Sequence, residues 1–212
     1  MDYRNNIKMN KALFIIFLSI VFFGEVKSQD FSNEERYRTA WNYRIDTNKL
    51  IFDIPTGFST IRMDNCNYGM WDCKNRQTYA FHRVLVSLDS SVVVGLRIDY
   101  NYTWTSPTGE LMSTKVNWAK NAAGLYDFLV DRNNKSVVLD SVLLAKHWDA
   151  EYGMKFTKEP CNISLYKKYR NIKNILIGNK DFQILMGYFY KDEFKYGIDS
   201  LIDNTITMIR KR

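Results

Sequence analysis

The stretch YRNIKNILIGNKDFQILMGYFYKD, from Tyr169 to Asp192, decides the fold that this sequence predicts. It contains two apolar runs separated by GNKD, a group of residues that favours a turn. Two such runs joined by a short polar break are typical of a β-hairpin. We therefore expect two long antiparallel strands late in the chain.

A second hairpin is predicted upstream of the first. YAFHRVLVSL alternates in character, DSS follows as a turn, and VVVGLRIDYNY returns with many β-branched residues. Shorter strands are predicted at 49–53, 58–63 and 151–157, and VVLDSVLLAKHW fits either a strand or a helix. Because neighbouring strands are joined by tight turns, we expect an antiparallel sheet.

Two helices are predicted to cover this sheet. Between Glu110 and Asp131 apolar residues recur at steps of three and four, which indicates an amphipathic helix. The segment 193–212 repeats this pattern as a closing helix. Its apolar face is formed by Phe194, Ile198, Leu201, Ile202, Ile206 and Ile209.

The predicted class is α+β, an antiparallel sheet with a mid-chain helix and a C-terminal helix packed on it. We expect one domain over 48–212, preceded by a polar N-terminal extension at 29–47.

This order of elements resembles the PsbP-like fold. The resemblance is carried by IPTGF after the first strand, the mid-chain helix, a late hairpin ending in MGYFYKDE, and the final amphipathic helix. It is strongest over 49–63 and 171–209. The resemblance implies an αβα sandwich in a small exported bacterial protein, with a binding or scaffolding role and no catalytic residues to carry over.

The N-terminus predicts export. Basic residues precede an unbroken apolar run from Ala12 to Gly24, and Val26 and Ser28 occupy the small-residue positions of a cleavage site. That layout is typical of a secretory signal peptide over 1–28. The run is shorter than the roughly 20 residues of a membrane-spanning helix. We expect cleavage near Ser28, a secreted or periplasmic product, and no integral membrane segment after the cut.

Composition argues against a nucleic-acid partner. The net charge of +7 is modest for 212 residues, and the basic residues are scattered apart from short blocks such as YKKYR. Cofactor motifs are absent too, because the sequence contains neither a G-x-G-x-x-G pattern nor a P-loop. No cofactor is therefore expected.

Cysteines point to a stapled loop. Cys66 and Cys73 enclose CNYGMWDC, and in an exported chain a disulfide between them is favoured, although Cys161 could pair with either. The spacing is not that of zinc ligands, so no metal site is expected. A bridged loop would present Tyr68, Met70 and Trp71 rigidly as a partner-binding surface.

Other aromatic residues lie in or beside predicted loops. Aromatic residues make up 15% of the chain. Exposed aromatic rings stack on sugars and bind protein partners. Those outside the cysteine loop are Trp41, Tyr43, Tyr100, Tyr102 and Trp104.

The segment HWDAE offers the alternative chemistry. On a strand, His147, Asp149 and Glu151 would share one face and could form a site for a hard metal ion. On a helix, residues two apart point in different directions, and this metal site could not form. Cys161, His147 and Asp149 could also form a nucleophile set, which needs a lowered thiol pKa and hydrogen-bond reach. No serine-hydrolase motif accompanies them.

The function predicted from sequence is therefore an exported, non-enzymatic binding or scaffolding module for a protein or glycan. The alternative is a small cysteine-dependent hydrolase or transferase that uses Cys161, His147 and Asp149. The sequence leaves the oligomeric state open.

Overall fold

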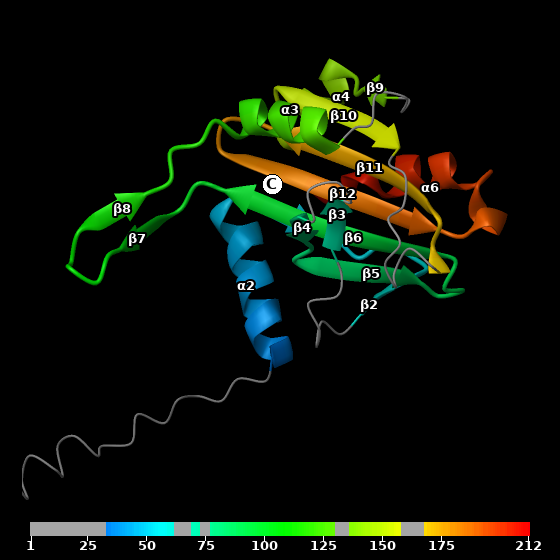
Figure 1. Cartoon of the computed structure of the whole chain (residues 1–212), viewed down its shortest axis with the longest axis horizontal. Helices are drawn as coiled ribbons and strands as arrows, with labels where there is room; N and C mark the ends of the chain where they lie inside the picture. The colour runs from blue at the N-terminus through cyan, green and yellow to red at the C-terminus, as the bar shows by residue number, and fades with distance from the viewer. Residues whose placement is uncertain (1–32, 62–68, 73–76, 130–135, 158–167) are drawn as a thin grey trace, which may run out of the picture. The chain divides into compact units, whose positions relative to one another are not determined.

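The computed structural model describes residues 33–61, 69–72, 77–129, 136–157 and 168–212. Within these ranges, seven strands form one sheet in which every neighbouring pair is antiparallel (Figure 1). This confirms the predicted antiparallel sheet. In spatial order the strands are β2 (Phe58–Thr60), β5 (Arg83–Ser87), β6 (Val92–Tyr100), β12 (Phe182–Tyr190), β11 (Asn171–Gly178), β10 (Tyr152–Thr157) and β9 (Ser136–Val138).

The quoted hairpin is β11–β12 and lies near the middle of the sheet. The two strands pair along their whole described length, with Ile175 opposite Met186. The turn is fixed by the Asn179 side chain, whose Oδ1 accepts hydrogen bonds from the backbone N–H groups of Asp181 and Phe182 at 2.8 and 2.9 Å. Asparagine often stabilises a tight turn in this way. The hairpin predicted from GNKD is confirmed.

The sheet is buried on both faces. Because side chains alternate along a strand, Val94, Leu96 and Ile98 of β6 enter one hydrophobic cluster, whereas Val93 enters another on the opposite face. On β12, Ile184 and Met186 belong to the first cluster and Leu185 to the second. Helices must therefore cover both faces.

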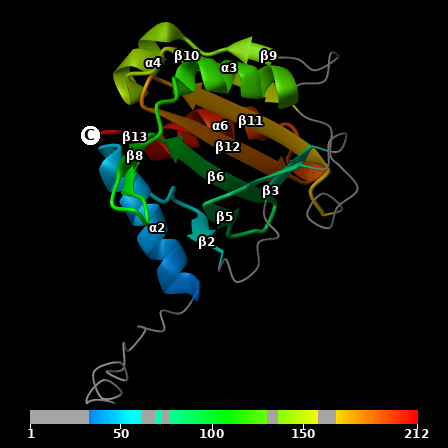
Figure 2. The ribbon, with the colours of Figure 1, turned by 60° about the vertical axis from the view of Figure 1, so that its left-hand side comes forward.

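The helices divide between these faces. Trp41, Leu144 and Ile198 place three helices on the first cluster, and Ala122 and Leu125 place α3 on the second. In both ribbon views α3 lies across the β10–β12 part of the sheet (Figures 1 and 2). The mid-chain and C-terminal helices thus lie on opposite faces, which confirms the α+β class. The helices are α2 (Asn33–Thr47), α3 (Trp118–Leu129), α4 (Ser141–Trp148) and α6 (Ile198–Thr205).

Helix α2 lies within the segment expected as an N-terminal extension. Trp41 and Ile45 are buried in the first cluster, and the Trp41 ring meets that of Phe52 edge-on at 5.0 Å. None of the helices in the described ranges is long and apolar enough to cross a membrane.

The mid-chain helix is shorter than predicted. The helix expected from Glu110 begins only at Trp118, and Leu111–Ser113 is instead strand β8, paired with β7 (Thr103–Thr105). Gly109 adopts a φ of +86°, and the turn Ser106–Glu110 closes through backbone bonds between its ends. The SPTGE break therefore forms a hairpin turn, and the helical spacing of Leu111 and Lys115 is fortuitous.

The C-terminus also departs from its prediction. Ile198, Ile202 and Ile206 are buried as expected, but the α-helix ends at Thr205 and two short 3-10 turns, Asp192–Phe194 (η1) and Ile206–Met208 (η2), flank it. The chain then forms β13 (Ile209–Lys211), which pairs with β1 (Leu50–Phe52). This pairing satisfies the backbone groups of β1, which helical residues could not do.

The ambiguous segment VVLDSVLLAKHW contains both structures. It forms β9 and then α4, and the change occurs at Asp140, whose carboxylate accepts from the N–H groups of Val142 and Leu143. An aspartate in this position caps a helix N-terminus.

Candidate functional site

His147, Asp149 and Glu151 do not share a strand face. His147 lies in the last turn of α4, and Asp149 follows as its C-cap in the left-handed region at φ 52°. The Asp149 carboxylate accepts a hydrogen bond from Lys211, which lowers its pKa. The idea that His147, Asp149 and Glu151 project from one strand is therefore wrong, because the segment is helical up to Trp148.

Cys161 lies outside the described residues, so the cysteine hydrolase or transferase remains a prediction. Among the residues that are described, no group of three or more His, Cys, Asp or Glu side chains is placed to hold a metal ion.

The predicted partner loop is described only in its backbone. Gly69–Asp72 forms β3 and pairs with β4 (Gln77–Ala80), with Trp71 opposite Thr78. Cys66, Tyr68 and Cys73 fall outside the described residues, as do the side chains of Met70 and Trp71. The disulfide and the loop surface therefore remain predictions.

A different site lies where β6 extends beyond the end of its neighbour β5. The last pair between β5 and β6 joins Arg83 to Leu96, so β6 continues to Tyr100 without β5 beside it. His82 closes part of this edge, because its backbone N–H donates to Leu96 O and its Nδ1 accepts from the N–H of Ile98 at 3.1 Å. We call this region the open end of the sheet.

Close packing of an aromatic ring on glycine holds His82 there. Gly95 of β6 pairs with Gly187 of β12, and the Phe81 ring lies over both. A Cβ on Gly95 would lie 2.3 Å from Phe81 Cδ2, and one on Gly187 would lie 3.0 Å from Phe81 Cζ. Only glycine leaves room for the ring, so these glycines fix the chain just before His82.

A row of hydrogen-bonded polar side chains crosses the open end. Asn121 Nδ2 donates to Gln183 Oε1 at 2.9 Å, and Gln183 Nε2 donates to Asp99 Oδ2 at 2.9 Å. Arg97 Nε donates to the same carboxylate at 2.8 Å, and its Nη1 donates to Ala80 O. Each group fixes the next, so the row from α3 to β6 is rigid.

Aromatic rings line the other side of the same strand end. The distance between ring centroids is 6.4 Å from Tyr43 of α2 to Tyr100, 5.8 Å from Tyr100 to Tyr102, and 5.3 Å from Tyr102 to Trp104. Tyr43, Tyr102 and Trp104 are 57%, 47% and 39% exposed. These four rings form a continuous, open surface that we call the aromatic ladder.

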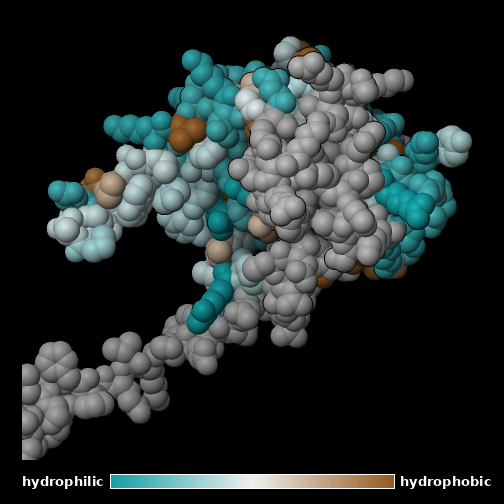
Figure 3. All heavy atoms as spheres, in the orientation of Figure 1, coloured by the Kyte–Doolittle hydropathy of each residue, from teal (hydrophilic) through white to brown (hydrophobic). Residues whose placement is uncertain are grey.

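The outer rings of the ladder stand on a projecting hairpin, the β7–β8 arm (Figure 1). Asn101 anchors this arm, because its Nδ2 donates to Val116 O and its Oδ1 accepts from Val116 N, both at 3.0 Å. Leu111 and Met112 are exposed on the arm, where hydrophobic spheres appear among pale ones (Figure 3). The base of the ladder is therefore held firmly while its face stays open.

The polar row and the ladder border one cleft. Two hollows of about 690 and 580 Å³ have Arg97, Asp99, Val116 and Trp118 in both of their linings. Each volume is in the range of ligand-binding clefts. The first also contains Asn117, Lys120, Asn121, Gly124, Leu125 and Gln183, and the second Arg44, His82, Ile98, Tyr100, Tyr102 and Thr114.

His82 is neutral in this cleft at neutral pH. Burial is the main cause that lowers its pKa from 6.5 to about 4, and the positive charges of Arg44 and Arg97 add to it, against an opposing contribution from Asp99. Since Nδ1 already accepts from Ile98, the proton is assigned to Nε2. The ring is thus a hydrogen-bond donor, not a general base.

These side chains suit recognition better than covalent chemistry. The cleft contains planar amide, carboxylate and guanidinium groups that are already oriented by one another, together with aromatic rings. Such groups can hydrogen-bond to a ligand and stack on it.

The sequence pointed to the aromatic residues of this site but not to its polar ones. Of the aromatic residues predicted in or beside loops, Tyr43, Tyr102 and Trp104 are exposed, whereas Tyr100 is partly buried and Trp41 is buried. Arg97, Asp99 and Gln183 were missed. The available signal was the R-x-D pair at the end of the apolar VVVGLRIDY, but Gln183 joins it only through the β6–β12 register that puts it opposite Asp99.

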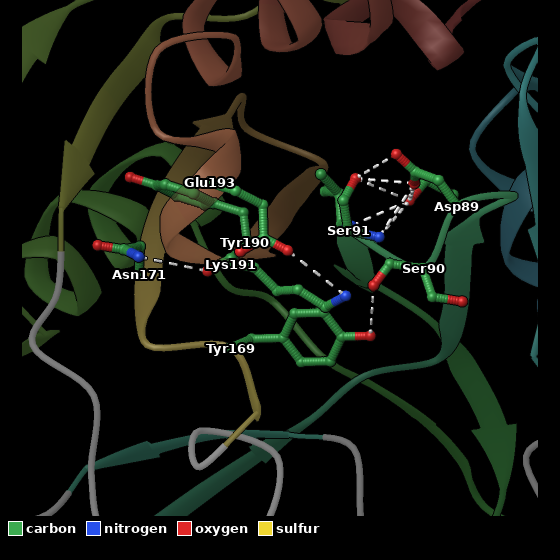
Figure 4. Close-up of polar contacts among 10 residues, drawn as sticks. Asp89, Ser90, Ser91, Tyr169, Asn171, Tyr190, Lys191 and Glu193 are labelled. Atoms are coloured by element: carbon green, nitrogen blue, oxygen red, sulfur yellow. Dashed lines mark hydrogen bonds and ion pairs between the residues drawn. The ribbon is translucent and has the colours of Figure 1, made fainter.

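At the other end of the sheet, the side chains of a second polar cluster form hydrogen bonds with one another (Figure 4). The Asp89 carboxylate accepts from the backbone N–H and the hydroxyl of Ser91 and from the hydroxyl of Ser87. These hydrogen bonds lower the pKa of Asp89 to about 2. Tyr169 donates to Ser90 O, and Lys191 N donates to Ser91 O. We call this the closed end; its polar groups stabilise the β5–β6 turn.

Comparison with known proteins gives little beyond this geometry. No protein-family model matches the sequence, and no curated protein matches it. A solved structure of cyanobacterial PsbP (CyanoP) from Synechocystis sp. PCC 6803 aligns over 78% of this chain and 88% of its own length, at a TM-score of 0.38 and 11% identity. A likeness at that level transfers no function.

Proposed function

We propose that this chain is an exported, non-enzymatic binding module that binds a glycan in the cleft at the open end of the sheet. The observation that carries the proposal is that the fixed polar row and two rings of the aromatic ladder, Tyr100 and Tyr102, line the same cleft. Sugars present hydroxyl groups around their edges and C–H groups on their faces, so they need both kinds of surface at once.

The polar row matches the edge of a sugar ring. Asp99 accepts hydrogen bonds, Gln183 and Asn121 both donate and accept, and Arg97 donates. Because these side chains hold one another in place, a ligand orders few rotamers when it binds. Such preorganisation lowers the entropic cost of association.

The ladder matches the faces of successive sugar rings. The ring centroids of Tyr102 and Trp104 lie 5.3 Å apart, at the start of the β7–β8 arm that Asn101 anchors. Tyrosine and tryptophan supply large contact area with few rotatable bonds. A protein partner would also bury the exposed Leu111 and Met112, but it would leave no special role for the polar row.

Export is the second part of the proposal and rests on the signal-peptide pattern over 1–28. The purified protein is expected to begin at Gln29 when its N-terminus is read by mass spectrometry after expression in an exporting host. Retention of Met1 or Met9 would contradict export by this route.

Titration calorimetry against a panel of neutral and acidic oligosaccharides tests glycan binding. We expect at least one to bind, and expect Tyr102→Ala and Asp99→Asn each to weaken it by about tenfold or more. Tyr196→Ala is the matched control, because Tyr196 is 98% exposed and follows η1, far along the chain from the ladder. Absence of binding, or binding that survives both cleft substitutions, would contradict the proposal.

A further inference from the structure

The cleft holds more positive charge than it neutralises. Among the described residues, its lining includes Arg44, Arg97 and Lys120 but only one carboxylate, that of Asp99. Arg97 is paired with Asp99 at 2.8 Å. Arg44 donates from Nη1 to Ala40 O, and in the described part of the chain neither Arg44 nor Lys120 has a carboxylate within ion-pair distance.

Elsewhere, several basic side chains of the sheet and the C-terminal strand form ion pairs. Lys173 donates to Asp199 at 2.6 Å, and Arg210 reaches Asp53 at the same distance. Lys211 pairs with Asp149. Unlike these three cations, Arg44 and Lys120 have no carboxylate within ion-pair distance in the described part of the chain.

The charge of Arg44 reaches the interior of the cleft. It contributes to the lowered pKa of His82, and it opposes the rise that burial causes in the pKa of Tyr100. Both side chains line the same hollow as Arg44. An anionic group placed there would gain from this field, which water screens less in a partly buried site than on an open surface.

We propose that the glycan is acidic, with its carboxylate or sulfate groups paired with Arg44 and Lys120 while its rings stack on the aromatic ladder. This inference rests on the proposed function and deepens it. Guanidinium groups bind carboxylates and sulfates through charge-assisted hydrogen bonds, which are shorter and stronger than neutral ones. Lysine adds a point charge without that directional preference.

Four probes test the class of ligand: an oligogalacturonate, a sulfated oligosaccharide, a neutral oligogalactoside of similar length, and polyglutamate. We expect at least one acidic oligosaccharide to bind about tenfold or more tightly than the neutral one at low salt, and expect added salt to reduce this advantage. Uronate binding identifies a carboxylate ligand, and binding of the sulfated probe alone identifies sulfate.

Two substitutions locate the charge. Arg44→Gln and Lys120→Gln are each expected to reduce affinity for the acidic probe by about fivefold to tenfold, and to reduce affinity for the neutral probe by less. Lys120 is exposed, so Lys120→Gln tests the idea even if Arg44→Gln destabilises the protein. Lys195→Gln is the control, because Lys195 is also exposed but follows η1, after the far end of β12.

The outcomes separate the two proposals. Equal affinity for neutral and acidic probes, with loss on Tyr102→Ala, would overturn the acidic ligand but keep the glycan. Tightest binding to polyglutamate would overturn the acidic glycan in favour of an acidic protein segment. No binding of any saccharide would overturn both.

Discussion

The two ends of β6 carry polar clusters that differ in how they are satisfied. At the closed end the Asp89 carboxylate is surrounded by donors within two residues of it, Ser87 and Ser91. At the open end Asp99 is met by Arg97 from its own strand and by Gln183 from far along the sequence. The first cluster is local and the second is built by the tertiary fold.

This difference distinguishes polar groups that stabilise the fold from polar groups that are available to a ligand. A local cluster such as that of Asp89 stabilises its own turn, and the serine donors around its carboxylate come from that same turn. The open end assembles residues from α2, α3, β6 and β12 beside a cleft, and it leaves Arg44 and Lys120 without carboxylate partners in the described part of the chain. This difference supports the proposal that a ligand binds at the open end.

The largest expected effect on stability comes from adding a side chain at Gly95, where the Phe81 ring packs against the backbone. Gly95→Ala is expected to lower the free energy of unfolding by about 3 kcal/mol, because the new Cβ would meet the Phe81 ring at 2.3 Å. Displacing Phe81 should also move His82 and weaken binding in the cleft. Urea denaturation, followed by calorimetry on the folded fraction, measures both effects.

Gly124→Ala is the control for that substitution. Gly124 lies in α3, and a Cβ there would meet nothing within 4 Å, so alanine is expected to stabilise the helix by up to about 1 kcal/mol. If Gly95→Ala were as well tolerated as Gly124→Ala, Phe81 would not hold the open end in place.

The next effect is a dependence of folding stability on pH that arises from His82 at the open end. His82 has a folded pKa of about 4 and an ordinary value of 6.5, so the unfolded chain takes up a proton first as the pH falls. The stability contributed by neutral His82 is full above about pH 6.5 and is lost as the pH falls through about 4. This loss should amount to about 2 to 3 kcal/mol.

His82→Asn isolates this contribution. Its side-chain oxygen can accept from the Ile98 N–H as Nδ1 does, but it does not titrate. Denaturation curves between pH 6.5 and 4 should therefore be flatter for the variant than for the parent protein. An identical slope would show that another group controls stability in this range.

The smallest effect is expected at the closed end. Asp89→Ala should cost about 1 kcal/mol of stability, because it removes the acceptor that orders Ser87 and Ser91 on an exposed turn. Affinity for the glycan should not change. Since the pKa of Asp89 is lowered from 3.8 to about 2, its contribution is present above about pH 3.8 and is lost as the pH falls through 2. Weaker glycan binding by this variant would contradict the division between the two ends.

Sequence patterns predicted the parts of the fold that depend on local periodicity. The β11–β12 hairpin follows from its apolar runs and from Asn179 in the turn, and the burial of Ile198 and Ile202 follows from helical spacing. Local spacing also misled, because Leu111 fits a helical stripe yet lies on an exposed arm closed by Gly109. Turn chemistry prevailed over periodicity there.

The open end could not be predicted because its geometry is non-local. Asp99 and Gln183 meet through the register of β6 with β12, and Asn121 joins them only when α3 packs on that face. Likewise, β13 departs from a helical pattern because β1, far away in sequence, offers it a partner. Periodicity within one segment contains no information on such pairings.

One measurement tests the central claim most directly: mapping amide chemical-shift changes in ¹⁵N-labelled protein during titration with the tightest-binding oligosaccharide. Binding at the open end predicts that the shifts concentrate at Arg97–Trp104 and Trp118–Asn121, while Asp89–Ser91 stays unchanged. Shifts confined to the Asp89 turn, or spread evenly over both ends of the sheet, would contradict the account.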